Sequence, residues 1–151
     1  MSIEAGAKAP AFSLPAHGGA TVSSAKLKGK PYVLYFYPKA DTSGCTKEAQ
    51  AFQASLPAFR KKGAEVIGVS RDPVKALDKF AVKYGLEFPL ASDEAGALTE
   101  AYGVWVEKSM YGRKYMGIER STFLVGADGK IAKAWPKVKI EGHAAEVLAA
   151  L

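Results

Sequence analysis

The stretch YVLYFYPKADTSGCTKEAQAFQ, residues 32–53, decides the fold. Its first six residues are aromatic, aliphatic or β-branched, which is typical of a strand buried on both faces. Pro38 ends this strand, because proline has no backbone N–H to donate to a neighbouring strand. The sequence therefore predicts a strand over 32–37 at the centre of a sheet.

A helix is expected to follow this strand, with the only cysteine of the chain in its first turn. Phe52 and Leu56 lie at helical spacing, and Thr42 and Ser43 upstream are suitable N-cap residues. Cys45 then lies where unpaired backbone N–H groups and the helix dipole favour a negative charge. These groups favour the thiolate over the thiol, and the thiolate is the nucleophilic form.

Outward from this stretch, strands and helices alternate and then give way to a hairpin around Asp128-Gly129. This order predicts an α/β fold in one domain over 1–151: a mixed central sheet flanked by helices on both faces, with an N-terminal β-hairpin. Pro57 should kink the first helix or begin a second short one. The other expected strands cover 12–14, 21–23, 65–70, 88–90, 121–125 and 131–135, and the other expected helices begin near Asp72, Asp93 and Gly142.

The composition limits the chemistry. A single cysteine excludes an intrachain disulfide and any multi-cysteine metal site, and such cysteine usage suits a reducing cytoplasm. The N-terminal residues include Glu4 and no apolar core, and no later run is long enough to cross a bilayer. We therefore expect a cytoplasmic protein that is neither exported nor membrane-bound.

The formal net charge of +6 raises the question of nucleic acid binding. The densest basic segment, 108–120, is interleaved with Tyr111 and Tyr115, as a binding surface can be. However, no nucleic-acid-binding module surrounds it, so we interpret it as a solvated loop with one buried functional arginine. No nucleic acid partner is expected.

Candidate partners for the Cys45 thiolate are few. A cation is needed to hold its charge, and Arg120 is the best candidate because it directly precedes the apolar strand STFLV. His17 in a turn and His143 at a helix start are expected at the surface or in capping roles, which disfavours a Cys-His hydrolase. The carboxylate of Glu48 is by default a solvent-facing helix residue, although it could help to orient an arginine.

The spacing of Pro38, Thr42 and Cys45 is P-x-x-x-T-x-x-C, which resembles the active-site motif of peroxiredoxins. The segments FYPKADTSGCTKEA, FAVKYGLEFPLASDE, AYGVWVEKSMYGRKYMGIERSTFLV and WPKVKIEGHAAEVL are similar to the bacterioferritin comigratory protein, or peroxiredoxin Q, branch of that family. The resemblance implies a thioredoxin-like fold and a thiol-dependent peroxidase that reduces hydrogen peroxide and organic hydroperoxides. Nothing in the sequence resembles a phosphate loop, a dinucleotide fingerprint or a zinc site, so no metal and no cofactor are expected.

The resemblance also implies the site residues. Cys45 would be the peroxidatic thiolate that is oxidised to a sulfenic acid. Thr42 would hydrogen-bond the thiolate and the peroxide, and Arg120 would lower the thiol pKa and stabilise the leaving oxygen. Pro38 would shield the pocket from water, and Glu48 would orient Arg120.

One departure from the family concerns the resolving cysteine. Many members of this branch carry it five residues after the first cysteine, where this chain has Gln50, and others carry it in the helix that corresponds to 78–84, where this chain has none. The Cys45 sulfenic acid therefore needs an external thiol (thioredoxin, glutathione or similar), or the Cys45 of a second subunit, in a monomer or weak homodimer. We favour the external thiol. The alternative function is redox sensing, in which Cys45 oxidation signals to a partner.

Overall fold

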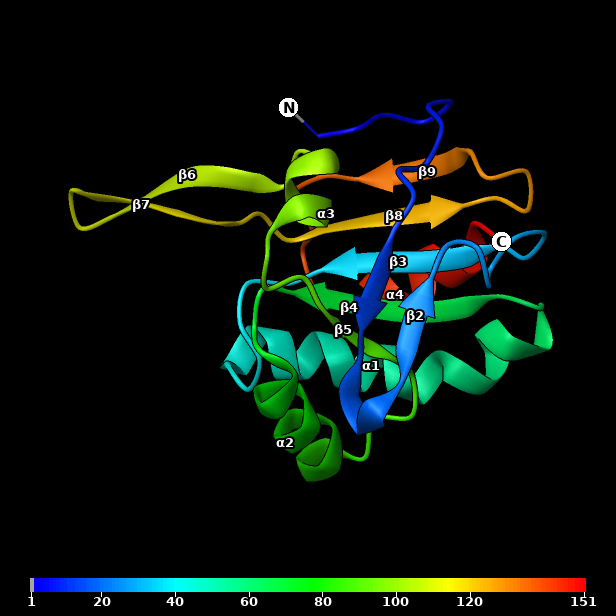
Figure 1. Cartoon of the computed structure of the whole chain (residues 1–151), viewed down its shortest axis with the longest axis horizontal. Coiled ribbons are helices and arrows are strands. Elements are labelled where there is room, and N and C mark those ends of the chain that lie inside the picture. Colours follow the sequence, from blue (N-terminus) through cyan, green and yellow to red (C-terminus); the bar gives the residue numbers. More distant parts are fainter. Residues whose placement is uncertain (1) are drawn as a thin grey trace.

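The computed structural model describes residues 2–151, and a five-stranded mixed sheet lies at its centre (Figure 1). The strands of this sheet are β3 (Tyr32–Phe36), β4 (Glu65–Ser70), β5 (Leu90–Ser92), β8 (Ser121–Val125) and β9 (Ile131–Trp135). Their order is β5-β4-β3-β8-β9. β4 runs parallel to β3 and β5, whereas β8 is antiparallel to β3 and β9. The predicted mixed sheet is confirmed.

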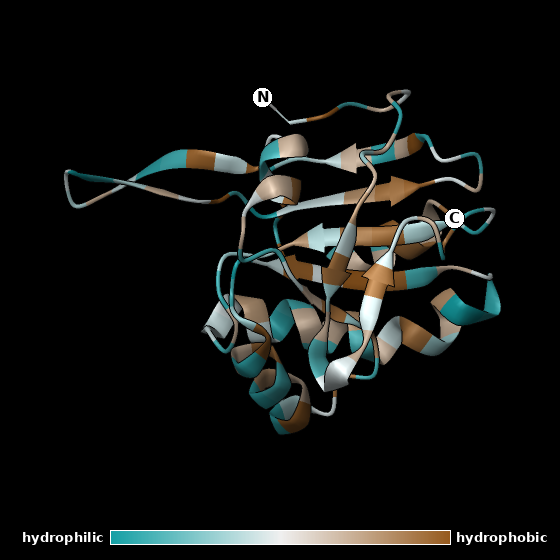
Figure 2. Ribbon diagram, in the orientation of Figure 1, coloured by the Kyte–Doolittle hydropathy of each residue, from teal (hydrophilic) through white to brown (hydrophobic). Residues whose placement is uncertain are grey.

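β3 occupies the middle of the sheet, as its composition predicts. All five of its residues are buried, so the strand contributes side chains to both faces. Tyr35 belongs to the core on one face, where it stacks on Phe52, and Phe36 belongs to the core on the other face, against Phe123. Figure 2 shows this apolar character along the central strands.

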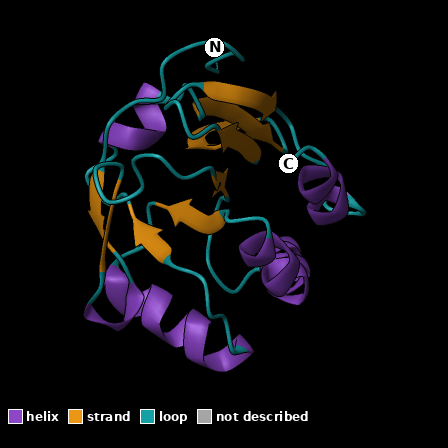
Figure 3. Ribbon diagram, turned by 90° about the vertical axis from the view of Figure 1, so that its right-hand side faces the viewer, coloured by secondary structure: helices purple, strands orange, loops and turns teal. Residues whose placement is uncertain are grey.

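Helices cover both faces of the sheet (Figure 3). One face packs against α1, α2 and α4, and the other against α3 and the two-stranded N-terminal hairpin, which is the hairpin predicted from the sequence. The helices are α1 (Ser43–Lys61), α2 (Val74–Tyr84), α3 (Ala97–Ala101) and α4 (His143–Ala149), and the hairpin strands are β1 (Ser13–Pro15) and β2 (Thr21–Ser23), joined through the 3-10 turn η1 (His17–Gly19).

The segment 105–118 corrects an expectation. Instead of a solvated loop it forms a second antiparallel hairpin, β6 (Trp105–Met110) with β7 (Arg113–Ile118), which projects from the body of the fold (Figure 1). Tyr111 and Gly112 at its tip both have positive φ, 51° and 77°, as a two-residue type I′ turn requires. Most of its side chains are exposed, so it contributes little to either core.

Two further elements differ from expectation. Pro57 does not begin a second helix: α1 continues through it, because tertiary packing of Phe52, Leu56 and Phe59 on the sheet extends on both sides of the proline. The short strand expected at 88–90 instead covers Leu90–Ser92, two residues later. Within residues 2–151, no helix combines the length and the apolar character that crossing a bilayer would need.

Candidate active site

The site forms where the chain leaves the central strand and begins α1. Thr42 is the N-cap residue of α1, and Cys45 lies in the first turn of the helix, as the sequence predicts. The Cys45 side chain is buried, with only 1% of its surface exposed. The cysteine is therefore placed at a helix N-terminus and is nearly closed off from solvent.

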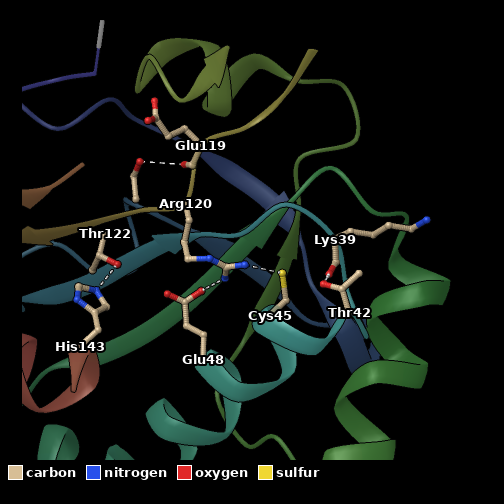
Figure 4. Close-up of polar contacts among 9 residues, drawn as sticks. Lys39, Thr42, Cys45, Glu48, Glu119, Arg120, Thr122 and His143 are labelled. Atoms are coloured by element: carbon tan, nitrogen blue, oxygen red, sulfur yellow. Dashed lines mark hydrogen bonds and ion pairs between the residues drawn. The ribbon is translucent and has the colours of Figure 1, made fainter. Parts of the chain in front are cut away.

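The guanidinium of Arg120 joins Cys45 to Glu48 (Figure 4). Its Nη2 donates to the Cys45 sulfur at 3.2 Å, and its Nη1 donates to Glu48 Oε1 at 2.6 Å. Arg120 precedes β8, and its carbonyl accepts a hydrogen bond from the Val138 amide, which fixes the backbone there. We refer to Cys45, Glu48 and Arg120 as the Arg120 cluster.

Gly44 makes the close approach of the arginine possible. A Cβ at this position would lie 3.3 Å from Arg120 Nη2 and 3.2 Å from Cδ1 of Ile140. Contacts of that length are tighter than packed side chains normally make. A larger residue would thus displace the guanidinium from the sulfur.

The Arg120 cluster is electrostatically coupled. Burial raises the pKa of Glu48 to about 7, although the charge of Arg120 acts in the opposite direction. Burial acts to lower the pKa of Arg120, but the neighbouring Glu48 and Cys45 outweigh it, so the pKa is raised and the guanidinium stays charged. A fixed positive charge therefore lies beside the cysteine sulfur.

Thr42 and Pro38 make no hydrogen bond to the Cys45 sulfur within residues 2–151. The Thr42 hydroxyl donates to the Lys39 carbonyl at 2.8 Å, and the Lys39 side chain extends away from Cys45 in Figure 4. Pro38 is exposed and lines a cavity of about 370 Å³ together with Lys108 and Tyr115. The structure thus brings three of the five predicted site residues together and leaves these two at its edge.

Comparisons with known proteins assign the chain to a family. Residues 5–134 match the AhpC/TSA family. The chain belongs to the AhpC/TSA family. It is 52% identical to the putative peroxiredoxin bcp of Coxiella burnetii over 151 residues, the full length of both chains. It is 50% identical to the peroxiredoxin Bcp of Xanthomonas campestris, over 95% of this chain and 91% of that one.

Solved structures of peroxiredoxins show the same fold. A cysteine-to-serine mutant of Xanthomonas campestris peroxiredoxin Q superposes with a TM-score of 0.91 at 47% identity, covering 98% of this chain and 97% of that one. The predicted thioredoxin-like fold and the resemblance to the peroxiredoxin Q branch are both confirmed. This chain is a one-cysteine peroxiredoxin, and the family is one of thiol-dependent peroxidases.

His143 corrects a second expectation. Rather than lying at the surface, it is buried, and its Nε2 is 2.8 Å from the Thr122 hydroxyl on β8. Its ring contacts Phe52 and Trp135 edge-on. Burial lowers the pKa of His143, which favours the neutral ring, and the ring packs in the core of this peroxiredoxin.

The hydrogen bonds of two aspartates near the site were not predicted from the sequence. Asp72 Oδ2 accepts hydrogen bonds from the Ala40 amide at 2.9 Å and from the Ser70 hydroxyl at 2.7 Å. Asp41 accepts hydrogen bonds from α2. A signal was available for Asp72, because it follows β4, whose carboxyl end lies beside that of β3.

Gln50, which occupies the position of a resolving cysteine in many members of this branch, faces away from the site. Gln50 is exposed on α1, whereas Cys45 is buried. Five residues along an α-helix place two side chains about 140° apart around the axis. Within residues 2–151, no group of three or more His, Cys, Asp or Glu side chains is arranged to hold a metal ion.

Proposed function

We propose that this peroxiredoxin reduces hydrogen peroxide and organic hydroperoxides through a sulfenic acid on Cys45, which an external thiol then reduces. The observation that carries the proposal is the Arg120 guanidinium, which donates to the Cys45 sulfur at 3.2 Å. A structure of the Xanthomonas campestris bacterioferritin comigratory protein, 47% identical to this chain, is described in terms of alkyl peroxide reduction activity. That relative supports organic hydroperoxides among the substrates.

The first half-reaction begins with in-line attack of the Cys45 thiolate on one peroxide oxygen. The sulfur–oxygen bond forms, the oxygen–oxygen bond breaks, and the second oxygen leaves as an alkoxide or hydroxide that takes a proton to become an alcohol or water. Arg120 stabilises the negative charge as it moves from sulfur to the leaving oxygen. Glu48 positions Arg120 through the 2.6 Å contact.

Thr42 and Pro38 have supporting roles in the proposal. Thr42 binds the peroxide by donating a hydrogen bond from its hydroxyl, which requires this group to leave the Lys39 carbonyl when substrate enters. Pro38 closes the pocket against water once the substrate is bound. Within residues 2–151 neither residue hydrogen-bonds the Cys45 sulfur, so both roles concern the bound peroxide.

The second half-reaction uses two external thiols. The first attacks the sulfenic sulfur, forms a mixed disulfide with Cys45 and releases water. The second attacks that disulfide, so that Cys45 leaves as a thiolate and the reductant leaves as its disulfide. Because the chain holds one cysteine, both electrons come from outside. Thioredoxin and glutathione are the reductant classes that we propose, acting in the cytoplasm on a monomer or weak homodimer.

The test begins with one equivalent of peroxide and a reagent that traps sulfenic acids. We expect one adduct per chain on Cys45 at neutral pH and none in Cys45→Ser. Absence of the adduct in the wild type would contradict the proposal. Steady-state turnover then separates the enzyme from a redox sensor: sustained peroxide consumption with glutathione or a thioredoxin system supports the enzyme, whereas one turnover per chain with every thiol supports the sensor.

A further inference from the structure

A second polar cluster holds the loop that leads into α1. The Tyr84 hydroxyl donates to Asp41 Oδ1 at 2.6 Å, and Lys83 Nζ donates to Asp41 Oδ2 at 2.9 Å. Both donors are at the C-terminal end of α2, and Asp41 is in the loop between β3 and α1. We refer to Asp41, Lys83 and Tyr84 as the Asp41 cluster.

The backbone of Asp41 indicates that this cluster holds the loop in an intrinsically unfavourable conformation. Asp41 has φ of +61°, in the left-handed region where residues other than glycine are disfavoured. Such a conformation persists where surrounding contacts determine it. Two charge-assisted hydrogen bonds on the Asp41 carboxylate supply such contacts. Losing them would favour other loop conformations.

The loop leads directly into the first turn of α1. Asp41 directly precedes the N-cap residue Thr42, and the Thr42 carbonyl accepts the amide of Thr46 at 2.8 Å in that turn. Cys45 is within the same turn and is only 1% exposed. Movement of the loop therefore changes the access of a second molecule to the sulfur.

Access matters differently for reductants of different size. A thiol must bring its own sulfur into bonding contact with the Cys45 sulfur. A thiol held on a protein surface needs a larger opening of the turn to reach a sulfur that is 1% exposed than a free amino-acid thiol does. The rate of reduction by a protein thiol is then proportional to the fraction of chains in which the turn is open.

We infer that the Asp41 cluster determines reductant specificity: it keeps the first turn of α1 closed, and so limits reduction of the Cys45 sulfenic acid by protein dithiols but not by small thiols. This inference rests on the proposed function, because it concerns the sulfenic acid formed there. Asp41, Lys83 and Tyr84 are positioning residues, since none of them touches the Cys45 sulfur among the hydrogen bonds of residues 2–151.

The test uses a double variant, Lys83→Met with Tyr84→Phe, in the full chain. Lys79→Met is the matched control, because Lys79 is an exposed lysine on the same helix with no hydrogen bond or ion pair within residues 2–151. Sulfenic acid is generated with one equivalent of hydrogen peroxide and mixed rapidly with free cysteine or with reduced thioredoxin. The rate constants for sulfenic acid formation and for each reduction are measured.

We expect the double variant to be reduced by thioredoxin about tenfold faster than the wild type, the change that a loss of ~1.4 kcal/mol in closing free energy produces. Its reactions with hydrogen peroxide and with cysteine should change by less than about twofold. Amide hydrogen exchange of residues 43–47 should accelerate about tenfold, since exchange reports local opening. The control should match the wild type in every rate.

Other outcomes overturn the inference. If thioredoxin reduces the double variant no faster than the wild type, or reduces neither of them, the cluster does not limit this step. Equal acceleration with cysteine and with thioredoxin would mean that it does not discriminate by size. The single variant Tyr84→Phe, with a smaller acceleration by thioredoxin in the same direction, provides the same test if the double variant fails to fold. Failure of the proposed function is seen separately, as absence of the sulfenic acid in the wild type.

Discussion

The Arg120 cluster and the Asp41 cluster lie on either side of the start of α1, and each contains an ion pair, but their surroundings differ. Arg120 and Glu48 have side chains that are 16% and 1% exposed, whereas Lys83 and Asp41 are 59% and 44% exposed. Burial makes the first pair a strong local field at the sulfur, and exposure leaves the second pair screened by solvent.

This difference in burial gives the two clusters different roles. The Arg120 cluster acts on the reactivity of the Cys45 sulfur, and the Asp41 cluster acts on access to it. The buried pair is not retained for stability, because burial raises the pKa of Glu48 to about 7 even with Arg120 beside it. A carboxylate that ionises less readily in the fold than in water lowers stability when it is charged. The buried pair instead positions a cation for the reaction, while the exposed pair holds a loop.

The largest expected effect comes from removing the buried cation. Arg120→Met should slow sulfenic acid formation by about 10²–10³-fold, the range observed when a donor to a developing negative charge is lost. Rapid-mixing measurements of peroxide consumption by the reduced protein would check it. The matched control is Arg113→Met, which removes an exposed arginine from β7.

The unfolding free energy of Arg120→Met should fall far less than its reactivity. Without Arg120, Glu48 can take up a proton and become neutral, so no charge is left buried without a partner. Thermal or denaturant unfolding at pH 7 would check this expectation. Parallel losses of reactivity and stability would make Arg120 a structural residue.

A second prediction concerns Glu48→Gln and pH. Because the pKa of Glu48 is raised from 4.5 in the unfolded chain to about 7 in the fold, the native state binds more protons than the unfolded state between these values. The wild type should therefore lose unfolding free energy relative to Glu48→Gln as the pH rises from about 5 to 8, by about 1–3 kcal/mol.

Denaturant unfolding of both proteins at pH 5, 6.5 and 8 would measure this difference. The comparison between the two proteins cancels the titration of other groups, including His143, whose lowered pKa acts with the opposite sign. A constant difference across the pH range would show that the carboxyl group of Glu48 ionises in the fold as it does in water.

The smallest expected effect belongs to the exposed pair. Lys83→Met should change the free energy of global unfolding by less than about 0.5 kcal/mol, since solvent-exposed ion pairs contribute little. Chemical denaturation at low and high salt would check it, with Lys79→Met as control. A loss as large as that from disrupting a buried pair would remove the distinction between the two clusters.

The fold was largely predictable because its strongest signals are local. The apolar run of β3, the turn at Asp128-Gly129 and the helical spacing of Phe52 and Leu56 each report burial or a turn directly. The β6–β7 hairpin was missed because most of its residues are exposed and its turn is Tyr111-Gly112. Type I′ turns prefer Asn or Asp before Gly, so tyrosine concealed the signal.

The site was predictable only in part. The place of Cys45 follows from its own strand and helix, whereas the selection of Arg120 needed its position before β8 and the family resemblance. The burial of His143 depends on Thr122 and Trp135, which lie in other elements, so its own neighbours in sequence carried no signal. Contacts between segments far apart in sequence are what local patterns cannot report.

The exposed position of Gln50, about 140° around α1 from Cys45, bears on how one-thiol and two-thiol peroxidases are related in evolution. A single substitution to cysteine there would meet no packing constraint, so gaining or losing that thiol leaves the fold intact. Forming a disulfide between the two positions, however, would require the start of the helix to unwind. Interconversion between the two kinds of enzyme thus needs a single substitution. Whether the second thiol can then form the disulfide depends on how readily a few helical residues unfold.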